Sequence, residues 1–185
     1  AAIRWLRANA AAHGIDPERI GAWGSSAGGH LVALLGVTGD VKDFDKGESL
    51  GVSSALQAVC DFFGPTDFLQ MSKFPSTIPH DSPTSPESKL IGGAIQENKA
   101  KVARANPLTF VSRGDAPFLI LHGDKDPLVP IHQSELLEAA LKQAGVEVTL
   151  VKLEGAGHGG QPFNQPEQQQ RVAAFFDQHL KRATK

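Results

Sequence analysis

Continuous apolar runs alternate with helix-like segments along this chain, and this alternation limits the folds open to it. The runs that indicate strands lie at residues 19–23, 56–64, 116–124 and 146–155. The segments that indicate helices lie at residues 1–13, 26–35, 97–105, 131–144 and 166–182. Strands that are apolar throughout are buried on both faces, which is typical of a parallel sheet. The sequence therefore predicts an α/β fold, a three-layer αβα sandwich with a mostly parallel sheet.

Length and composition predict one packed domain. The chain has 185 residues, of which 41% are hydrophobic, and we expect a single, partial catalytic domain over residues 1–185. Within it, prolines, serines and threonines gather at residues 71–98. This composition indicates an irregular excursion over the surface, with a short helix near residues 86–91.

Charge and cysteine content exclude several classes of partner. The formal net charge is −2 and no basic stripe is present, so we expect no nucleic acid partner. No apolar run is long enough to cross a membrane, and we expect no membrane partner. Cys60 is the only cysteine and the histidines lack ligand spacing, so we expect no metal and no cofactor. The chain begins without a signal-like segment, as if in the middle of an element, which leaves both a cytoplasmic and a secreted location open.

The stretch from Gly24 to Gly28 has the pattern Gly-x-Ser-x-Gly and joins a predicted strand to a predicted helix. In this pattern the serine sits on a strained turn that exposes its hydroxyl group. We expect Gly24 and Gly28 to let the strand and the helix pack closely around the turn. A flexible turn is the alternative interpretation, but the flanking strand and helix favour Ser26 as a nucleophile.

A nucleophilic serine needs a base, an acid that orients the base, and donors for the oxyanion. Asp124 and Asp126 follow the predicted strand 116–124, and His158 follows the strand 146–155. Because catalytic groups in parallel sheets gather at the carboxyl ends of the strands, we expect these side chains to meet Ser26. The order Ser, Asp, His along the chain is that of an α/β-hydrolase.

Longer motifs around these residues resemble those of hormone-sensitive-lipase-like and feruloyl-esterase-like α/β-hydrolases, a group of serine carboxylesterases. The matching stretches, spread between about residues 3 and 180, are GSSAGGHL, DFFGPTDF, LILHGDKDPLVP and EGAGHGG. The resemblance implies that Asp126 is the acid, while Asp124 structures the loop. It also implies that His158 takes the proton from Ser26, and that the backbone N–H of Ala27 is an oxyanion donor.

Other residues near these motifs are weaker candidates. Ser25, Asp67 and Phe68 are candidates for the substrate pocket, although Asp67 fits a turn-and-cap role equally well. We interpret His30 as structural, and His122 as a packing or hydrogen-bonding residue at the end of a strand.

The resembling family has further strands and an oxyanion loop, His-Gly-Gly, before the serine, and neither precedes Ser26 here. We therefore expect an α/β-hydrolase fold that lacks its N-terminal strands. Loss of an oxyanion donor lowers turnover by roughly 10²–10³, so activity is expected to be weak unless another group substitutes. The strand at residues 19–23 becomes a sheet edge with unpaired backbone groups. We expect this edge to form a homodimer or higher oligomer, or to bind a partner fragment that carries the missing strands.

The function that the resemblance implies is a serine carboxylesterase acting on short acyl or aryl esters, including acetyl or feruloyl esters of plant polysaccharide. A serine peptidase domain like that of prolyl oligopeptidase shares the order Ser, Asp, His, but its usual elbow, Gly-x-Ser-Tyr-Gly, differs from GSSAGGH. A third alternative is a catalytically weak, truncated hydrolase that acts as a binding or assembly module.

Overall fold

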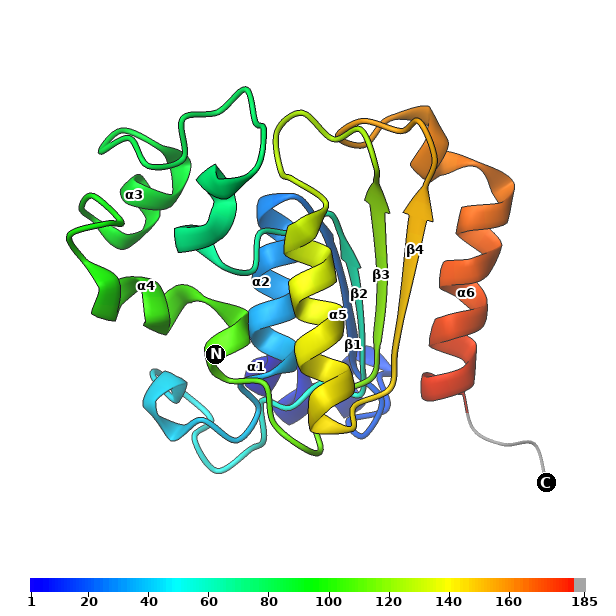
Figure 1. Cartoon of the computed structure of the whole chain (residues 1–185). Coiled ribbons are helices and arrows are strands. Elements are labelled where there is room, and N and C mark those ends of the chain that lie inside the picture. Colours follow the sequence, from blue (N-terminus) through cyan, green and yellow to red (C-terminus); the bar gives the residue numbers. More distant parts are fainter. Residues whose placement is uncertain (182–185) are drawn as a thin grey trace.

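The sheet at the centre of the computed structural model, which describes residues 1–181, is parallel throughout. Its strands, in spatial order, are β1 (Gly21–Ser25), β2 (Ala58–Phe62), β3 (Phe118–Gly123) and β4 (Val148–Leu153). All strands point the same way in Figure 1, so their carboxyl ends meet at one edge of the sheet. The predicted strand runs thus form one sheet, in the order in which they occur along the chain.

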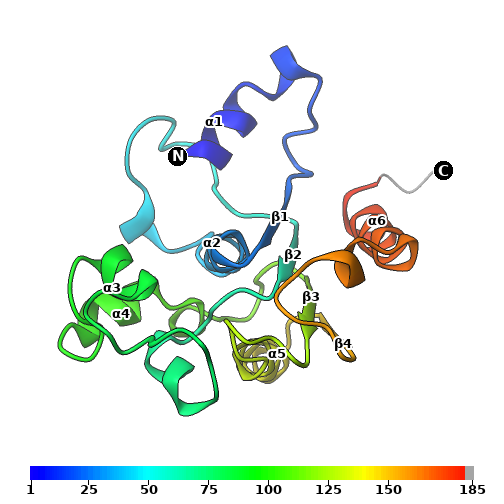
Figure 2. The same ribbon diagram turned by 90° about the horizontal axis from the view of Figure 1, so that it is seen from above.

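Helices cover both faces of this sheet, as predicted. The helices of the fold are α1 (Ala2–Ala8), α2 (Ala27–Gly36), α3 (Pro86–Ile91), α4 (Lys99–Ala105), α5 (His132–Ala144) and α6 (Pro166–Leu180), of which α2, α5 and α6 pack on the strands. Seen from above, α2 and α5 lie on one face and α6 lies on the other (Figure 2). The three-layer α/β arrangement is confirmed. No helix among residues 1–181 has the length and apolar character needed to cross a membrane.

Two apolar clusters pack against the sheet, one on each face, and a third, smaller one contains Phe68, Ile95 and Val102. Val59 and Ile120 belong to the cluster that includes α2 and α5, whereas Cys60 and Leu121 belong to the cluster that includes α6. Neighbouring residues of a strand point to opposite faces, and here both faces are covered. This explains why β2 and β3 are apolar runs rather than alternating patterns.

Some element boundaries differ from the expectation. The first helix ends at Ala8 and continues as a short 3-10 helix, and the first strand lies at Gly21–Ser25 instead of residues 19–23. The last helix ends at Leu180, and residue 182 of the expected helix lies outside the described residues.

The segment 71–98 is irregular except for α3 and the end of a 3-10 helix at Phe68–Lys73. Part of the segment is buried, which corrects the expectation of a surface excursion. Met71, His80 and Ile95 are almost fully buried, and the segment lies beside the carboxyl ends of the strands in Figure 1. It therefore contributes to the interior at the end of the sheet where the candidate site residues gather.

Strand β1 pairs with β2 on one side and is the first strand in the order of the described sheet. Trp23 on this strand keeps 47% of its surface exposed. The expected edge strand is therefore present, and its pairing with a second chain stays a prediction.

Candidate active site

The turn between β1 and α2 has the geometry that the Gly-x-Ser-x-Gly pattern predicts. Ser26 has φ 56° and ψ −122°, a strained conformation for a residue with a side chain. Its backbone N–H donates a hydrogen bond of 2.8 Å to the carbonyl oxygen of Phe62 in β2. A Cβ atom at Gly24 would lie 2.3 Å from the carbonyl oxygen of Gly28. Glycine is therefore required at position 24 for the strand and the helix to approach each other.

Close packing of α2 requires a glycine at position 29. The expectation that Gly28 has this role is wrong. A Cβ atom at Gly28 would meet nothing within 4 Å. At Gly29 a Cβ atom would lie 2.2 Å from Oδ1 of Asp61 and 2.8 Å from the carbonyl oxygen of Phe62. The close approach of α2 to β2 is thus made one residue later than the pattern suggested.

The structure brings Ser26, His158 and Asp126 together in one hydrogen-bonded chain. Oγ of Ser26 lies 2.8 Å from Nε2 of His158, and Nδ1 of His158 lies 2.7 Å from Oδ2 of Asp126. The three residues come from the turn after β1, the loop after β4 and the loop after β3. In this geometry the hydroxyl of Ser26 donates to a neutral imidazole, whose other nitrogen donates to the carboxylate.

The carboxylate of Asp126 is held in its ionised form. Burial alone would raise its pKa, but hydrogen bonds from His122, from His158 and from the backbone N–H groups of Val129 and Leu128 outweigh that effect. They hold the pKa of Asp126 well below its ordinary value. The two backbone bonds to Oδ1 measure 2.8 Å from Leu128 and 3.0 Å from Val129. Asp126 can thus orient and stabilise a charged imidazole at His158.

A cavity of about 260 Å³ opens beside Ser26. Ser26, Ala27 and His158 line it together with mostly apolar side chains. Ala27 is the first residue of α2, and the first N–H groups of a helix have no partner within the helix. Ala27 thus combines a place in the cavity lining with a helix-terminal N–H of the polarity that an oxyanion needs, and its role as oxyanion donor stays a prediction.

The weaker candidates divide between this cavity and other places. Phe68 lines the cavity and is buried. Ser25 is exposed and lines a separate hollow together with Trp23. Asp67 is outside the cavity lining and caps a short 3-10 helix, accepting hydrogen bonds from the Leu69 N–H at 3.1 Å and from Nδ2 of Asn106 at 3.0 Å. Of the two roles weighed for Asp67, the geometry matches the turn and cap.

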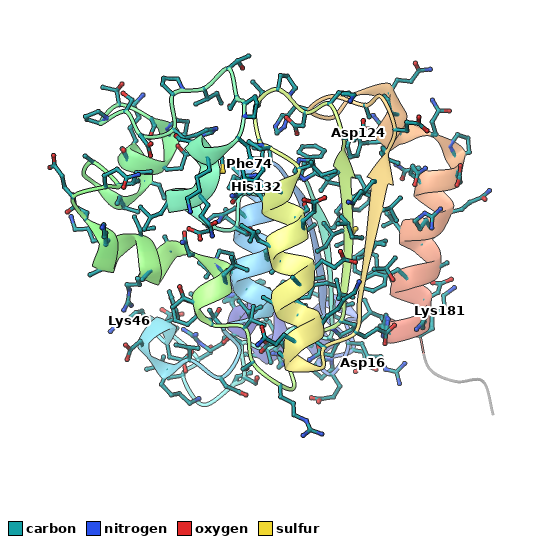
Figure 3. The ribbon with its side chains drawn as sticks, in the orientation of Figure 1. Asp16, Lys46, Phe74, Asp124, His132 and Lys181 are labelled. Carbon is teal, nitrogen blue, oxygen red and sulfur yellow. The ribbon has the colours of Figure 1, made fainter. Side chains whose placement is uncertain are left out.

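Asp124 and His30 occupy the structural positions expected of them. Oδ1 of Asp124 accepts a hydrogen bond of 2.7 Å from the backbone N–H of Gly155, which ties the loop after β3 to the loop after β4. Figure 3 shows Asp124 at the end of the sheet from which both loops leave. Nδ1 of His30 lies 3.0 Å from the carbonyl oxygen of Pro65, and burial lowers the pKa of His30. His30 is therefore neutral in the cavity wall.

Three further residues support the site, and sequence reasoning missed two of them, His80 and Glu87. His122 was interpreted as a packing or hydrogen-bonding residue at the end of a strand, which is confirmed. His122 contacts Asp126, while His80 and Glu87 line the cavity as a buried pair with 3.0 Å between Nδ1 and Oε1. A signal for His122 was present, since it lies four residues before Asp126. No sequence signal identified His80 and Glu87, because their pairing depends on the path of an irregular segment.

The sequence is similar to known families and proteins along most of its length. The chain matches the family model BD-FAE over residues 1–141 and the model of the dienelactone hydrolase family over residues 100–185. Esterase LipQ of Mycobacterium tuberculosis is 32% identical over 158 residues, which cover 85% of this chain and 36% of LipQ. The chain spans between 32% and 39% of the length of LipQ and of two further Mycobacterium tuberculosis esterases, LipC and LipM.

Solved structures of esterases share the fold. A truncated form of a carbohydrate esterase from gut microbiota is similar with a TM-score of 0.87 and 35% identity, over 98% of this chain and 66% of that chain. A butyrate-bound esterase from the planctomycete Thermogutta terrifontis is similar with a TM-score of 0.72 and 29% identity, over 95% of this chain and 62% of that chain. The parallel sheet, the strained serine turn and these matches agree: the chain belongs to the BD-FAE family and has the α/β-hydrolase fold of its esterase relatives.

Proposed function

We propose that this chain carries the catalytic residues of a serine carboxylesterase that hydrolyses short acyl or aryl esters. The observation that supports this most directly is the hydrogen-bonded chain from Ser26 through His158 to Asp126, at the mouth of an apolar cavity. A buried carboxylate, an imidazole and a strained serine in this order activate a hydroxyl group for attack on a carbonyl carbon.

The reaction would proceed in two halves through an acyl-enzyme. His158 takes the proton from Ser26 as Oγ attacks the ester carbonyl carbon, and the Ala27 N–H stabilises the oxyanion. The tetrahedral intermediate then collapses, the bond to the alcohol breaks, and His158 donates the proton to the leaving oxygen. Water, activated by the same histidine, cleaves the acyl-enzyme and releases the acid. Full stabilisation of the oxyanion needs a second N–H donor in addition to that of Ala27.

The size and polarity of the cavity favour a small substrate group. At about 260 Å³ the cavity is smaller than the roughly 300–1,000 Å³ of sites for drug-sized ligands. An acetyl group fits it easily, and an aryl acyl group such as feruloyl would fill it. A gut carbohydrate esterase and a butyrate-bound esterase are among the similar structures, which supports short acyl esters, including those of carbohydrates. Acetyl and feruloyl esters of plant polysaccharide, which the sequence motifs suggested, are therefore tested beside butyryl esters.

The test compares Ser26→Ala with Ser25→Ala. The two serines are adjacent in the chain, but only Ser26 contacts His158, so Ser25→Ala is the matched control. With p-nitrophenyl acetate, p-nitrophenyl butyrate and methyl ferulate, we expect S25A to stay active and S26A to lose several orders of magnitude in kcat. A fluorophosphonate probe should label the wild type at Ser26, as read by peptide mass spectrometry.

Other outcomes would distinguish the alternatives. Equal ester hydrolysis by the wild type and S26A contradicts the proposal. Cleavage of aminoacyl p-nitroanilides that exceeds ester hydrolysis would favour the peptidase. A folded protein that neither reacts with the probe nor cleaves any substrate would favour the binding module.

A further inference from the structure

The segment 76–91 supplies one wall of the cavity beside Ser26. Ile78, Pro86 and Leu90 contribute apolar surface to the cavity, and His80 and Glu87 lie in the same wall. His80 is 1% exposed and Glu87 is 6% exposed. Ionisable side chains are rarely buried to this extent unless they are paired. The pair is therefore a built feature of the wall, and the proposed ester chemistry does not use it.

Hydrogen bonds join this wall to the loop of Asp126. The backbone N–H and Oγ1 of Thr77 donate to the carbonyl oxygen of Pro127 at 2.7 and 3.0 Å. Oγ of Ser76 donates to the carbonyl oxygen of Leu128 at 2.9 Å. Nε2 of His80 lies 3.0 Å from that same carbonyl oxygen. Since the N–H of Leu128 binds Oδ1 of Asp126, the wall and the carboxylate are held by the same short stretch of chain.

Two contacts of His80 are made together only by a charged imidazole. Nδ1 lies 3.0 Å from Oε1 of Glu87, and Nε2 lies 3.0 Å from the carbonyl oxygen of Leu128. A carboxylate and a carbonyl group only accept hydrogen bonds, so keeping both contacts takes a proton on each ring nitrogen. Oγ of Ser76 also lies 3.1 Å from Nε2 and can donate to it once that nitrogen has lost its proton, which breaks the bond to Leu128. A neutral imidazole can keep one of these two contacts but not both.

The chain just before this segment is attached to α5 by a contact of its own. Phe74 stacks on His132 of α5 with 3.6 Å between the ring centroids, and Figure 3 shows the two side chains together. Loss of the His80 contacts would therefore loosen the cavity wall locally and leave the beginning of the segment attached to α5.

We propose that His80 is a positioning residue of this active site. Paired with Glu87 of α3, it holds the cavity wall against the loop of Asp126, and thereby fixes both the shape of the substrate pocket and the place of the carboxylate. The inference rests on the proposed esterase activity and assigns a role to residues outside the Ser26, His158 and Asp126 chain.

The surroundings of His80 set the direction of its pH dependence. Burial alone would lower its pKa, but the hydrogen bond and charge of Glu87, the Leu128 carbonyl and the charge of Asp81 outweigh it and raise the pKa. Glu87 from α3 and Asp81 from the same loop are the titratable groups that act on it, and the Asp126 loop presents the Leu128 carbonyl. Because the folded-state pKa is raised, the positioning contacts are complete at low pH and are lost as pH rises through that pKa.

The key variant is Glu87→Gln, which keeps the shape and an acceptor for Nδ1 but removes the charge. We expect the rise in KM with alkaline pH to begin at a lower pH in E87Q than in the wild type, with similar KM at about pH 6. At pH 8, KM for p-nitrophenyl butyrate should be about tenfold higher in E87Q, as for the loss of one charge-assisted hydrogen bond, and kcat should fall less. His80→Gln should show the raised KM at all pH values, and His13→Gln, at an exposed histidine, should change nothing.

A merely structural role predicts a different result: lower melting temperatures for E87Q and H80Q, with unchanged KM and an unchanged pH profile at temperatures where both are folded. That result would overturn the inference. Proton and ¹⁵N NMR of the histidine rings gives a readout that needs no turnover. We expect His80 to be doubly protonated at neutral pH in the wild type, and the proton between His158 and Asp126 to shift in H80Q.

The NMR experiment also separates the two proposals. If no ester is cleaved while that shared proton shifts in H80Q, the esterase proposal fails and the positioning role stands. If esters are cleaved but the proton stays at the same frequency in H80Q and E87Q, the positioning role is wrong and the esterase stands.

Discussion

His122 and Asp126 are in contact within the interior, with 3.3 Å between Nε2 and Oδ2 and no exposure of either side chain. The same Nε2 lies 2.8 Å from the carbonyl oxygen of Val129, and Nδ1 lies 2.7 Å from Oγ of Ser134. Since a carbonyl group only accepts, Nε2 carries a proton and its N–H is shared between Val129 and Asp126. His122 thus contacts Oδ2 of Asp126, the same carboxylate oxygen that His158 binds.

Replacing His122 by Gln should impair catalysis more than substrate binding. A hydrogen bond to a charged group contributes roughly 1.5–3 kcal/mol, so we expect kcat to fall by about ten- to hundredfold. KM should change little, because His122 does not line the cavity. Steady-state kinetics on a variant shown to be folded by circular dichroism checks this. A kcat equal to that of the wild type would show that His158 and the loop backbone hold Asp126 unaided.

The adjacent glycines of α2 should respond oppositely to a methyl group. Gly28→Ala has open space for its Cβ and gains helix propensity of up to about 1 kcal/mol. Gly29→Ala would place its Cβ 2.2 Å from Asp61 and 2.8 Å from the backbone of Phe62, and overpacking of this kind destabilises by roughly 1–3 kcal/mol or more. Urea unfolding of the two variants measures the difference. Equal stabilities would contradict the close approach of α2 to β2.

Asp61 should make stability fall as pH rises. Its side chain is fully buried in β2, and burial, opposed by the Gly64 N–H and by His122, raises the pKa to about 6. Its Oδ2 has no hydrogen-bond partner among residues 1–181. When the pKa of an acid is higher in the folded than in the unfolded state, its ionisation lowers the free energy of unfolding. This loss is absent below the unfolded-state pKa, grows as pH rises, and is complete above the folded-state pKa.

Asp61→Asn removes this titration. The free energy of unfolding of the wild type, relative to D61N, should fall by up to about 3 kcal/mol between about pH 4 and pH 6, because each pKa unit corresponds to about 1.4 kcal/mol. Denaturant unfolding at several pH values gives the difference, in which the other titrating groups cancel. A difference that stays constant over this range would show that Asp61 is ionised in the folded state.

The edge strand β1 predicts self-association. Trp23 is 47% exposed and contacts the ring of Phe62 edge-on, with 5.3 Å between the centroids. Because a charged side chain on an edge strand hinders pairing, Trp23→Lys should shift an oligomer toward the monomer. Light scattering after gel filtration, over a range of concentrations, measures the mass of both proteins. A wild type that is monomeric at every concentration would refute the expected pairing.

The strands and the main site residues could be predicted because their signals are local. The apolar runs of β2 and β3 show burial on two faces, and the chemistry of Ser26 and His158 appears directly after a strand in each case. A parallel sheet then brings such residues together without further information. The start of β1 was misplaced by two residues, because an apolar pattern marks burial and does not mark where the ladder of hydrogen bonds begins.

The wall of the cavity could not be predicted, because its contacts are not local in the sequence. His80 and Glu87 are seven residues apart in a segment rich in proline and serine, and this composition indicated surface. Their partner Leu128 is 48 residues from His80 in the sequence. Such a contact depends on the path of an irregular chain, which neither periodicity nor turn propensity specifies.

Some residues of the cavity wall bind the loop that carries Asp126, whereas others only line the cavity. Ile78, Pro86 and Leu90 line the cavity, and their side chains are apolar. Thr77 and His80 bind the loop that carries Asp126. A directed-evolution library for new acyl groups is therefore best confined to positions 78 and 90, whose side chains line the cavity and make none of the bonds that hold the acid loop.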